Sequence, residues 1–137
     1  MANEITILFQ LENSVPFICA DGTGIEKGTL VKITDPFTVA ASAADHDAVI
    51  GVTTEEKIAN DGKTKVPVCM RAICKGVAGT AGVTAGQCID SDTGTSALNK
   101  LADCAVNAEN IVGRALETAA ATETFLFLLD PYAANLA

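Results

Sequence analysis

Aromatic and basic residues are scarce in this sequence, and their scarcity excludes several kinds of partner. The 137 residues include no Trp, one Tyr and five Phe, too few to build the aromatic platform on which single-stranded nucleic acids stack. Nine Lys and Arg residues face 17 Asp and Glu residues, which gives a formal net charge of −8 at pH 7. Such a chain repels the phosphates of nucleic acids and of anionic membranes. We therefore expect no nucleic-acid partner and no membrane partner.

Long apolar segments are also missing from the sequence. The opening residues, MANEITILFQ, contain no basic segment followed by a long apolar run, so we expect no signal peptide. No stretch approaches the roughly 18 consecutive apolar residues of a membrane-spanning helix. The five cysteines form no Cys-x-x-Cys pair, and we interpret them as small buried side chains in a reducing cytosol, with disulfides or a metal as the alternatives. The cysteines are Cys19, Cys69, Cys74, Cys88 and Cys104.

Short β-rich runs bounded by Gly, Pro, Asp or Asn make up most of the chain. Alternate positions near the N-terminus are apolar, which predicts a strand or arm over residues 1–15 with one apolar face. These positions are Ile5, Ile7, Phe9 and Leu11. Further strand-like runs cover residues 29–33, 48–55, 64–70, 110–117 and 124–130. Helix signals are weak, and residues 40–49 and 96–106 can each hold at most a short helix.

Two of these runs are separated by a recognisable turn. Residues 59–64 read ANDGKT, and the Asp-Gly step tolerates the positive φ angles of a tight hairpin. We therefore predict that residues 49–57 and 64–71 pair as antiparallel strands. Pro67 cannot donate a ladder hydrogen bond, so we place it at a sheet edge or at a bulge.

Two sequence words occur twice, in the same order. GIEKGTLV, which begins at Gly24, matches GVTAGQCI, which begins at Gly82. Further along, VIGVTTE matches IVGRALE. We interpret residues 18–71 and 76–130 as two copies of one unit, with coincidence between short, common words as the alternative.

The repeat leads to a predicted fold. We expect an all-β protein, a small β-barrel or sandwich built from two pseudo-repeated halves within a single β domain over residues 16–137. Because each copy shows too few strands to bury its own apolar face, we expect the two copies to close one barrel together. Gly28 and Gly86 are expected at turns that enter a strand. Gly51 and Gly113 are expected inside strands, at a bulge or a close approach of two backbones.

His46 is the only histidine of the chain, and it stands between Asp45 and Asp47. Such a cluster could ligate a metal, but adjacent residues in an extended chain point in opposite directions, so we interpret it as a solvated polar turn. Residues 90–96 read DSDTGTS and resemble the start of a calcium loop, yet Gly94 falls at position five of that loop instead of six. We interpret this second segment as a hairpin turn.

Two carboxylates recur at equivalent places in the two copies. Glu55 and Glu117 could act as an acid–base pair only where both converge in a cleft, and we interpret them as exposed charges at strand ends. The sequence contains no recognisable nucleophile motif, phosphate-binding loop or dinucleotide fingerprint. We therefore predict no catalytic residue, no cofactor and no metal, and a protein that is not an enzyme.

Several longer stretches resemble a known family. They read GIEKGTLVKI … TVAASAADHDAVIGVTTEE, then GKTKVPVCMRAI, then GVTAGQCID … NIVGRALETA, and they span about residues 15–130. This pattern resembles the small capsid decoration, or cement, proteins of tailed bacteriophages. The resemblance implies a compact β-barrel or sandwich subunit, commonly a homotrimer, made in the host bacterial cytoplasm. It also implies binding to the major capsid protein on the outer surface of the virion, where the subunit braces the shell.

The N-terminal strand is the candidate partner-binding segment. We hypothesise that it reaches the capsid shell or a neighbouring subunit by adding a strand to a sheet edge, and the alternative is an ordinary barrel strand. The candidate contact residues are Ile5, Ile7, Phe9 and Leu11. Two other functions stay open. A phage head-fibre or receptor-recognition module would carry a long stalk, and a small β-barrel ligand-binding or enzymatic domain would need a concave pocket with convergent polar groups.

Overall fold

Eleven β-strands form the described part of the protein. The computed structural model describes residues 3–94, 96–104 and 110–133, and no helix occurs within these ranges. The strands are β1 (Thr6–Gln10), β2 (Val15–Ile18), β3 (Leu30–Thr34), β4 (Thr38–Ala41), β5 (Val49–Thr53), β6 (Lys65–Cys69), β7 (Ala72–Ala78), β8 (Cys88–Ser91), β9 (Lys100–Asp103), β10 (Asn110–Ala115) and β11 (Thr124–Ala133). The prediction of an all-β fold is confirmed for these residues.

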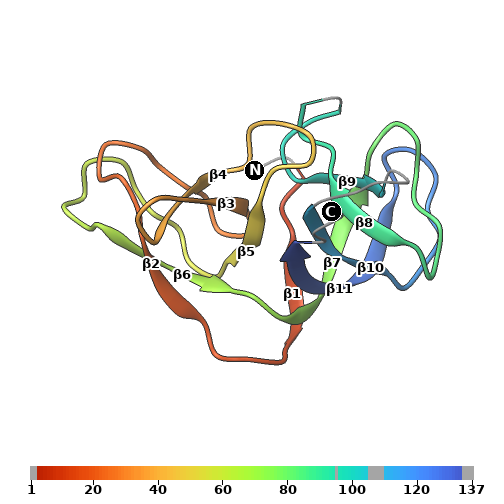
Figure 1. The fold of residues 1–137 in the computed structure, drawn as a ribbon, viewed down its shortest axis with the longest axis horizontal. Helices are drawn as coiled ribbons and strands as arrows, with labels where there is room; N and C mark the ends of the chain where they lie inside the picture. Colours follow the sequence, from red (N-terminus) through yellow and green to blue (C-terminus); the bar gives the residue numbers. More distant parts are fainter. Residues whose placement is uncertain (1–2, 95, 105–109, 134–137) are drawn as a thin grey trace.

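The strands close into two five-stranded barrels. In the first barrel the strand order is β2-β4-β3-β5-β6, and β6 returns to pair with β2. In the second barrel the order is β7-β11-β10-β8-β9, and β9 returns to pair with β7. Figure 1 shows the two barrels next to each other along the longest axis of the molecule, with β1 between them.

The two barrels repeat one topology. Each has four antiparallel pairings and one parallel pairing, which is β2–β4 in the first barrel and β7–β9 in the second. Equivalent loops also make equivalent hydrogen bonds. The amide of Gly28 donates a hydrogen bond to the carbonyl oxygen of Thr53 at 3.0 Å. In the second barrel, the amide of Gly86 donates to the carbonyl oxygen of Ala115 at 2.8 Å. The repeated sequence words are therefore a structural repeat.

The expectation that both copies close one barrel together is wrong, because β2 to β6 close the first barrel and β7 to β11 close the second. β2 and β7 begin before residues 18 and 76, so each structural repeat starts earlier than predicted. Some of the barrel strands are only four residues long. β4 overlaps residues 40–49 and β9 lies within residues 96–106, the two segments in which the sequence permits a short helix. Such short strands suffice in a closed barrel, since each one has hydrogen-bonding neighbours on both sides.

Two apolar clusters fill the barrels, and one of them crosses the junction between them. The cluster of the first barrel consists of Phe17, Cys19, Ile25, Val31, Val39, Val66 and Val68. The larger cluster surrounds Phe127 and Leu129 of the second barrel and extends to Leu30 and Val52 of the first barrel, all of them fully buried. β5 accordingly contacts both β10 and β11. The barrels thus pack against each other through a shared core.

Two glycines allow neighbouring strands to approach closely. A Cβ at Gly51 in β5 would collide with the carbonyl oxygen of Cys69 in β6. A Cβ at Gly113 in β10 would collide with the carbonyl oxygen of Leu128 in β11. Both glycines therefore lie inside strands at a close backbone approach, and the prediction made for them is confirmed.

The predicted hairpin is present, but its proline is not at a sheet edge. β5 and β6 pair antiparallel as expected. Gly28 and Gly86 lie at turns that enter β3 and β8, as expected, with φ angles of +79° and +88°. β6 has strand neighbours on both sides, so placing Pro67 at a sheet edge is wrong. Pro67 lies opposite Pro16, and its carbonyl oxygen accepts a hydrogen bond from Thr54, one residue past the end of β5. Pro67 lies just past the last paired residues of β5 and β6, so its missing amide removes a hydrogen bond only at the end of that ladder. The β2–β6 register shows no shift at Pro67, so the bulge alternative is not met either.

Candidate partner surface and barrel junction

β1 is attached to both barrels. It pairs antiparallel with the first part of β7, while β9 pairs with Val77 and Ala78 further along the same strand. At the start of β1, the amide of Ile5 donates to the carbonyl oxygen of Gly28 in the first barrel at 3.0 Å. The Ile5 side chain is 2% exposed and belongs to the larger apolar cluster. The N-terminal segment is therefore a structural part of the junction as well as a candidate surface.

A register shift divides the apolar residues of β1 between two directions. Ile7 lies opposite Cys74, whereas Phe9 lies opposite the next residue, Ile73, so that Leu8 is an extra residue in the ladder. Side chains alternate across a strand with a period of two, and one extra residue reverses the alternation. Ile7 packs against the core, and Phe9 is 65% exposed. The expectation of one continuous apolar face from residue 5 to residue 11 is therefore wrong.

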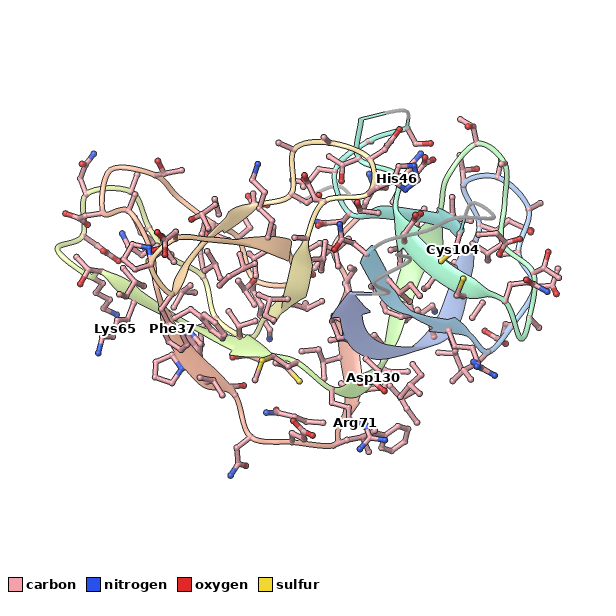
Figure 2. The ribbon with its side chains drawn as sticks, viewed as in Figure 1. Phe37, His46, Lys65, Arg71, Cys104 and Asp130 are labelled. Carbon is pink, nitrogen blue, oxygen red and sulfur yellow. The ribbon has the colours of Figure 1, made fainter. Side chains whose placement is uncertain are left out.

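The exposed half of this segment forms the candidate partner surface. We call Leu8, Phe9 and Leu11 the β1 surface; their exposed fractions are 44%, 65% and 49%. The backbone of Leu11 is held by a 3.0 Å hydrogen bond from its amide to the carbonyl oxygen of Arg71. Figure 2 shows Arg71 and Asp130 on the same side of the molecule as β1. Partner binding by this surface stays a prediction.

A polar contact closes the opposite side of the junction. The loop between β4 and β5 carries Asp45 and His46, β8 carries Asp90 and Ser91, and the turn that follows β8 carries Gly94. The Nδ1 atom of His46 is hydrogen-bonded to Oδ2 of Asp90, and the His46 amide donates to the carbonyl oxygen of Ser91 at 3.3 Å. The amide of Gly94 donates to Oδ1 of Asp45 at 2.9 Å. The two segments that the sequence suggested as separate polar turns therefore bind each other.

The His46–Asp90 pair joins an exposed ring to a buried carboxylate. The side chain of Asp90 is 2% exposed, and that of His46 is 54% exposed. The hydrogen bond to Asp90 raises the pKa of His46, and the charges of Asp90, Asp45 and Asp92 raise it further, while burial opposes them. The Ser91 hydroxyl donates to the carbonyl oxygen of Ala44 and not to the imidazole. The pair therefore links the two barrels, and the Ser91 hydroxyl is directed to the backbone of the β4–β5 loop.

A buried lysine links two loops of the first barrel. Lys57 is 2% exposed, and its Nζ donates to Oδ1 of Asp61 at 2.8 Å and to Oδ1 of Asp21 at 3.1 Å. The equivalent position of the second barrel is Ala119, which forms the matching β-bridge. Sequence reasoning missed this contact, because it singled out none of the nine Lys and Arg residues. The available signal was the replacement of lysine by alanine within an otherwise repeated pattern.

One pocket lies beside this lysine. Its volume is about 440 Å³, and its lining includes Glu26, Thr29 and Leu98 together with Lys57. The Thr29 hydroxyl donates to the carbonyl oxygen of Glu26 at 2.7 Å, and Nζ of Lys57 is held by the two aspartates. Ligand pockets rely on a few polar groups that are free to orient the ligand. Here two of those groups already have partners within the protein.

The two repeated glutamates lie on the surface. Glu55 and Glu117 follow the equivalent strands β5 and β10, and both are exposed. Oε1 of Glu117 accepts a 2.9 Å hydrogen bond from the amide of Leu126 within its own barrel. Both glutamates are therefore exposed charges at strand ends, and their contacts do not bring them together in a cleft.

The described residues give no further sign of a prosthetic group. Within residues 3–94, 96–104 and 110–133, no group of three or more His, Cys, Asp or Glu side chains is arranged to hold a metal ion. Over the same ranges, no helix has the length and apolar character needed to cross a bilayer. Comparison of the chain with known proteins finds no matching family model and no matching curated protein. What the protein does must be inferred from its own surface and sequence.

Proposed function

We propose that the protein is a structural, non-enzymatic capsid decoration protein, which binds the outer surface of a phage head and stabilises the shell. Its partner is the major capsid protein, and it acts as a homotrimer on the virion. The resemblance of residues 15–130 to phage decoration proteins supports this proposal. The barrel fold is of the kind that the resemblance implies, and the negative net charge suits a protein that must not compete for the packaged genome.

The observation that carries the proposal is the outward turn of Phe9 and Leu11 on an anchored strand. Large apolar side chains grouped on the surface of a soluble protein mark an interaction site. Because Ile5 is fixed in the core and bonded to the first barrel, the β1 surface is presented on a rigid support. Rigid presentation lowers the ordering cost of binding. Many copies around one shell then need only a modest contact each.

Co-sedimentation with expanded, undecorated phage heads tests this proposal. We expect saturable binding of the wild-type protein, and Phe9→Ser should weaken it about tenfold, the loss typical of a large apolar side chain at an interface. Ile58→Ser is the matched control, because Ile58 is exposed to a similar extent, 59% against 65%, but lies in a loop of the first barrel. Equal losses in both variants, or none in Phe9→Ser, would contradict a specific role for the β1 surface.

Point variants serve this test better than removal of the arm. A deletion of residues 2–12 would also remove Ile5 from the core and its bond to Gly28. A loss of binding by that deletion could then reflect a damaged junction. The same sedimentation assay separates the other functions, since a receptor-recognition module would bind host cells and not heads.

A further inference from the structure

We propose that Cys88 and Cys104 are a disulfide-forming pair, which links β8 to the end of β9 under oxidising conditions. This inference concerns the second barrel alone and does not depend on the proposed function. All five thiols are free in the structure, so the pair is present in its reduced form.

The strand register brings the two cysteines face to face. β8 pairs antiparallel with β9 with Ile89 opposite Asp103, so the next pair in the same register is Cys88 and Cys104. The amide of Cys104 donates to the carbonyl oxygen of Cys88 at 2.9 Å. Opposite residues at such a position have Cα atoms about 5.5 Å apart, inside the range of about 4.4–6.8 Å that a disulfide spans. Their Cβ atoms start further apart than the about 3.8 Å of a formed disulfide, so the ends of the two strands must move slightly together when the bond forms.

The side chains of this pair lie on the outer face of the barrel. Ile89 points into the core and is fully buried, so Cys88 next to it points outward. Opposite residues of an antiparallel pair point to the same face, and both cysteines are partly exposed. In Figure 2, the label of Cys104 stands beside sulfur atoms at the surface of the second barrel. A hydrogen bond with the Cys88 thiol contributes, after burial, to the raised pKa of Cys104.

The other three cysteines are poor candidates for oxidation. Cys19, Cys69 and Cys74 are at most 3% exposed. Burial raises the pKa of Cys74 and of Cys104 alike, so solvent access and not ionisation separates the two groups of cysteines. Cys88 and Cys104 are thus the two thiols that a small oxidant in solution can reach.

The chemistry requires an oxidant, for which we name glutathione disulfide. The Cys88 thiolate attacks one sulfur of glutathione disulfide, forms a mixed disulfide and releases one glutathione. Cys104 loses its proton to solvent and attacks the Cys88 sulfur, which expels the second glutathione. Two protein thiols are oxidised and one glutathione disulfide is reduced to two thiols. Because the pKa of Cys104 is raised, the second step should accelerate as the pH increases above neutrality.

The link would close a loop that carries half of the polar junction. This loop runs from Cys88 to Cys104 and includes Asp90, the partner of His46. Closing a loop of this size constrains the unfolded chain, and we expect the melting temperature to rise by roughly 10 °C. Should the protein act on the outside of a virion, as proposed above, the link would form after release from the reducing cytoplasm.

Peptide mapping of the purified full chain tests the inference directly. After incubation with glutathione disulfide at about pH 8 and blocking of free thiols, trypsin cuts at Lys75, Lys100 and Arg114. We expect peptides 76–100 and 101–114 to be joined, and dithiothreitol to separate them. Cys88→Ser and Cys104→Ser should each abolish the joined species, whereas Cys19→Ser should keep it.

Melting curves of the same samples complete the test. Oxidation should raise the melting temperature of the wild-type protein and leave that of the Cys88→Ser/Cys104→Ser double variant unchanged. Stable glutathione adducts without the joined peptides, or joined peptides that involve the buried cysteines, would overturn the inference. Joined peptides with no change in melting temperature would overturn the claim that the link stabilises the barrel. None of these outcomes bears on binding to phage heads, which is measured separately.

Discussion

Replacing His46 by asparagine should weaken the junction between the barrels in a pH-dependent way. The substitution removes the imidazole that is hydrogen-bonded to the buried carboxylate of Asp90. His46 has a φ of +59°, in the left-handed region that asparagine tolerates better than most residues. The variant therefore removes the charged partner without adding backbone strain.

The size and sign of the effect follow from the environment of the pair. A hydrogen bond that involves a charged group contributes about 1.5–3 kcal/mol to the free energy of unfolding. For this pair we expect about 1 kcal/mol, because the His46 ring is half exposed and solvent screens its charge. The pKa of His46 is raised in the folded protein. Its stabilisation is therefore complete below the unfolded pKa of about 6.5 and is lost as the pH rises through the higher folded value.

Urea denaturation at about pH 6 and about pH 9 measures this contribution. The wild-type protein should lose about 1 kcal/mol more of its unfolding free energy between the two pH values than His46→Asn does. At about pH 6 the variant should be less stable than the wild type by at least this amount, since Asp90 keeps its burial and loses its partner. The same pH dependence in both proteins would contradict a stabilising bond between His46 and Asp90.

Two further predictions concern the repeat itself. Gly113→Ala should lower the free energy of unfolding in urea by about 3 kcal/mol, because the added Cβ meets the carbonyl oxygen of Leu128. Gly22→Ala is the control, and it should change the free energy of unfolding by less than about 0.5 kcal/mol, because its Cβ meets no atom closer than 3.8 Å. Equal effects of the two substitutions would contradict the close packing of β10 on β11. Lys57→Ala should lower the melting temperature and speed amide hydrogen exchange in the two loops that Lys57 joins. Lys63→Ala, at an exposed lysine, should do neither. An unchanged exchange pattern in Lys57→Ala would show that the lysine contact is dispensable.

Local signals in the sequence predicted the parts of the fold that depend on neighbouring residues. The Asp-Gly turn predicted the pairing of β5 with β6, and the repeated glycines predicted the close approach at Gly51 and Gly113. β2 and β7 lie outside the predicted strand-like runs. β4 and β9 escaped prediction because alanine has low β-propensity and their four-residue length leaves little alternation to detect. Closure of each copy into its own barrel depends on these two strands, so it could not be predicted either.

The candidate site was less predictable than the fold. Alternation alone placed the apolar residues of β1 on one face, and no residue near Leu8 signals the register shift that turns Phe9 outward. The contact between His46 and Asp90 joins positions 44 residues apart, which no local pattern can reveal. Both features arise where the two barrels meet, and that arrangement is set by the shared core.

The stoichiometry of binding to expanded, undecorated phage heads tests a role in capsid decoration most directly. The purified protein should bind until it reaches a plateau at three chains per site, and the decorated heads should withstand heating that disrupts bare heads. Analytical ultracentrifugation of the free protein should show a trimer. A protein that sediments as a monomer and shows no saturable binding to any head would contradict a role in capsid decoration.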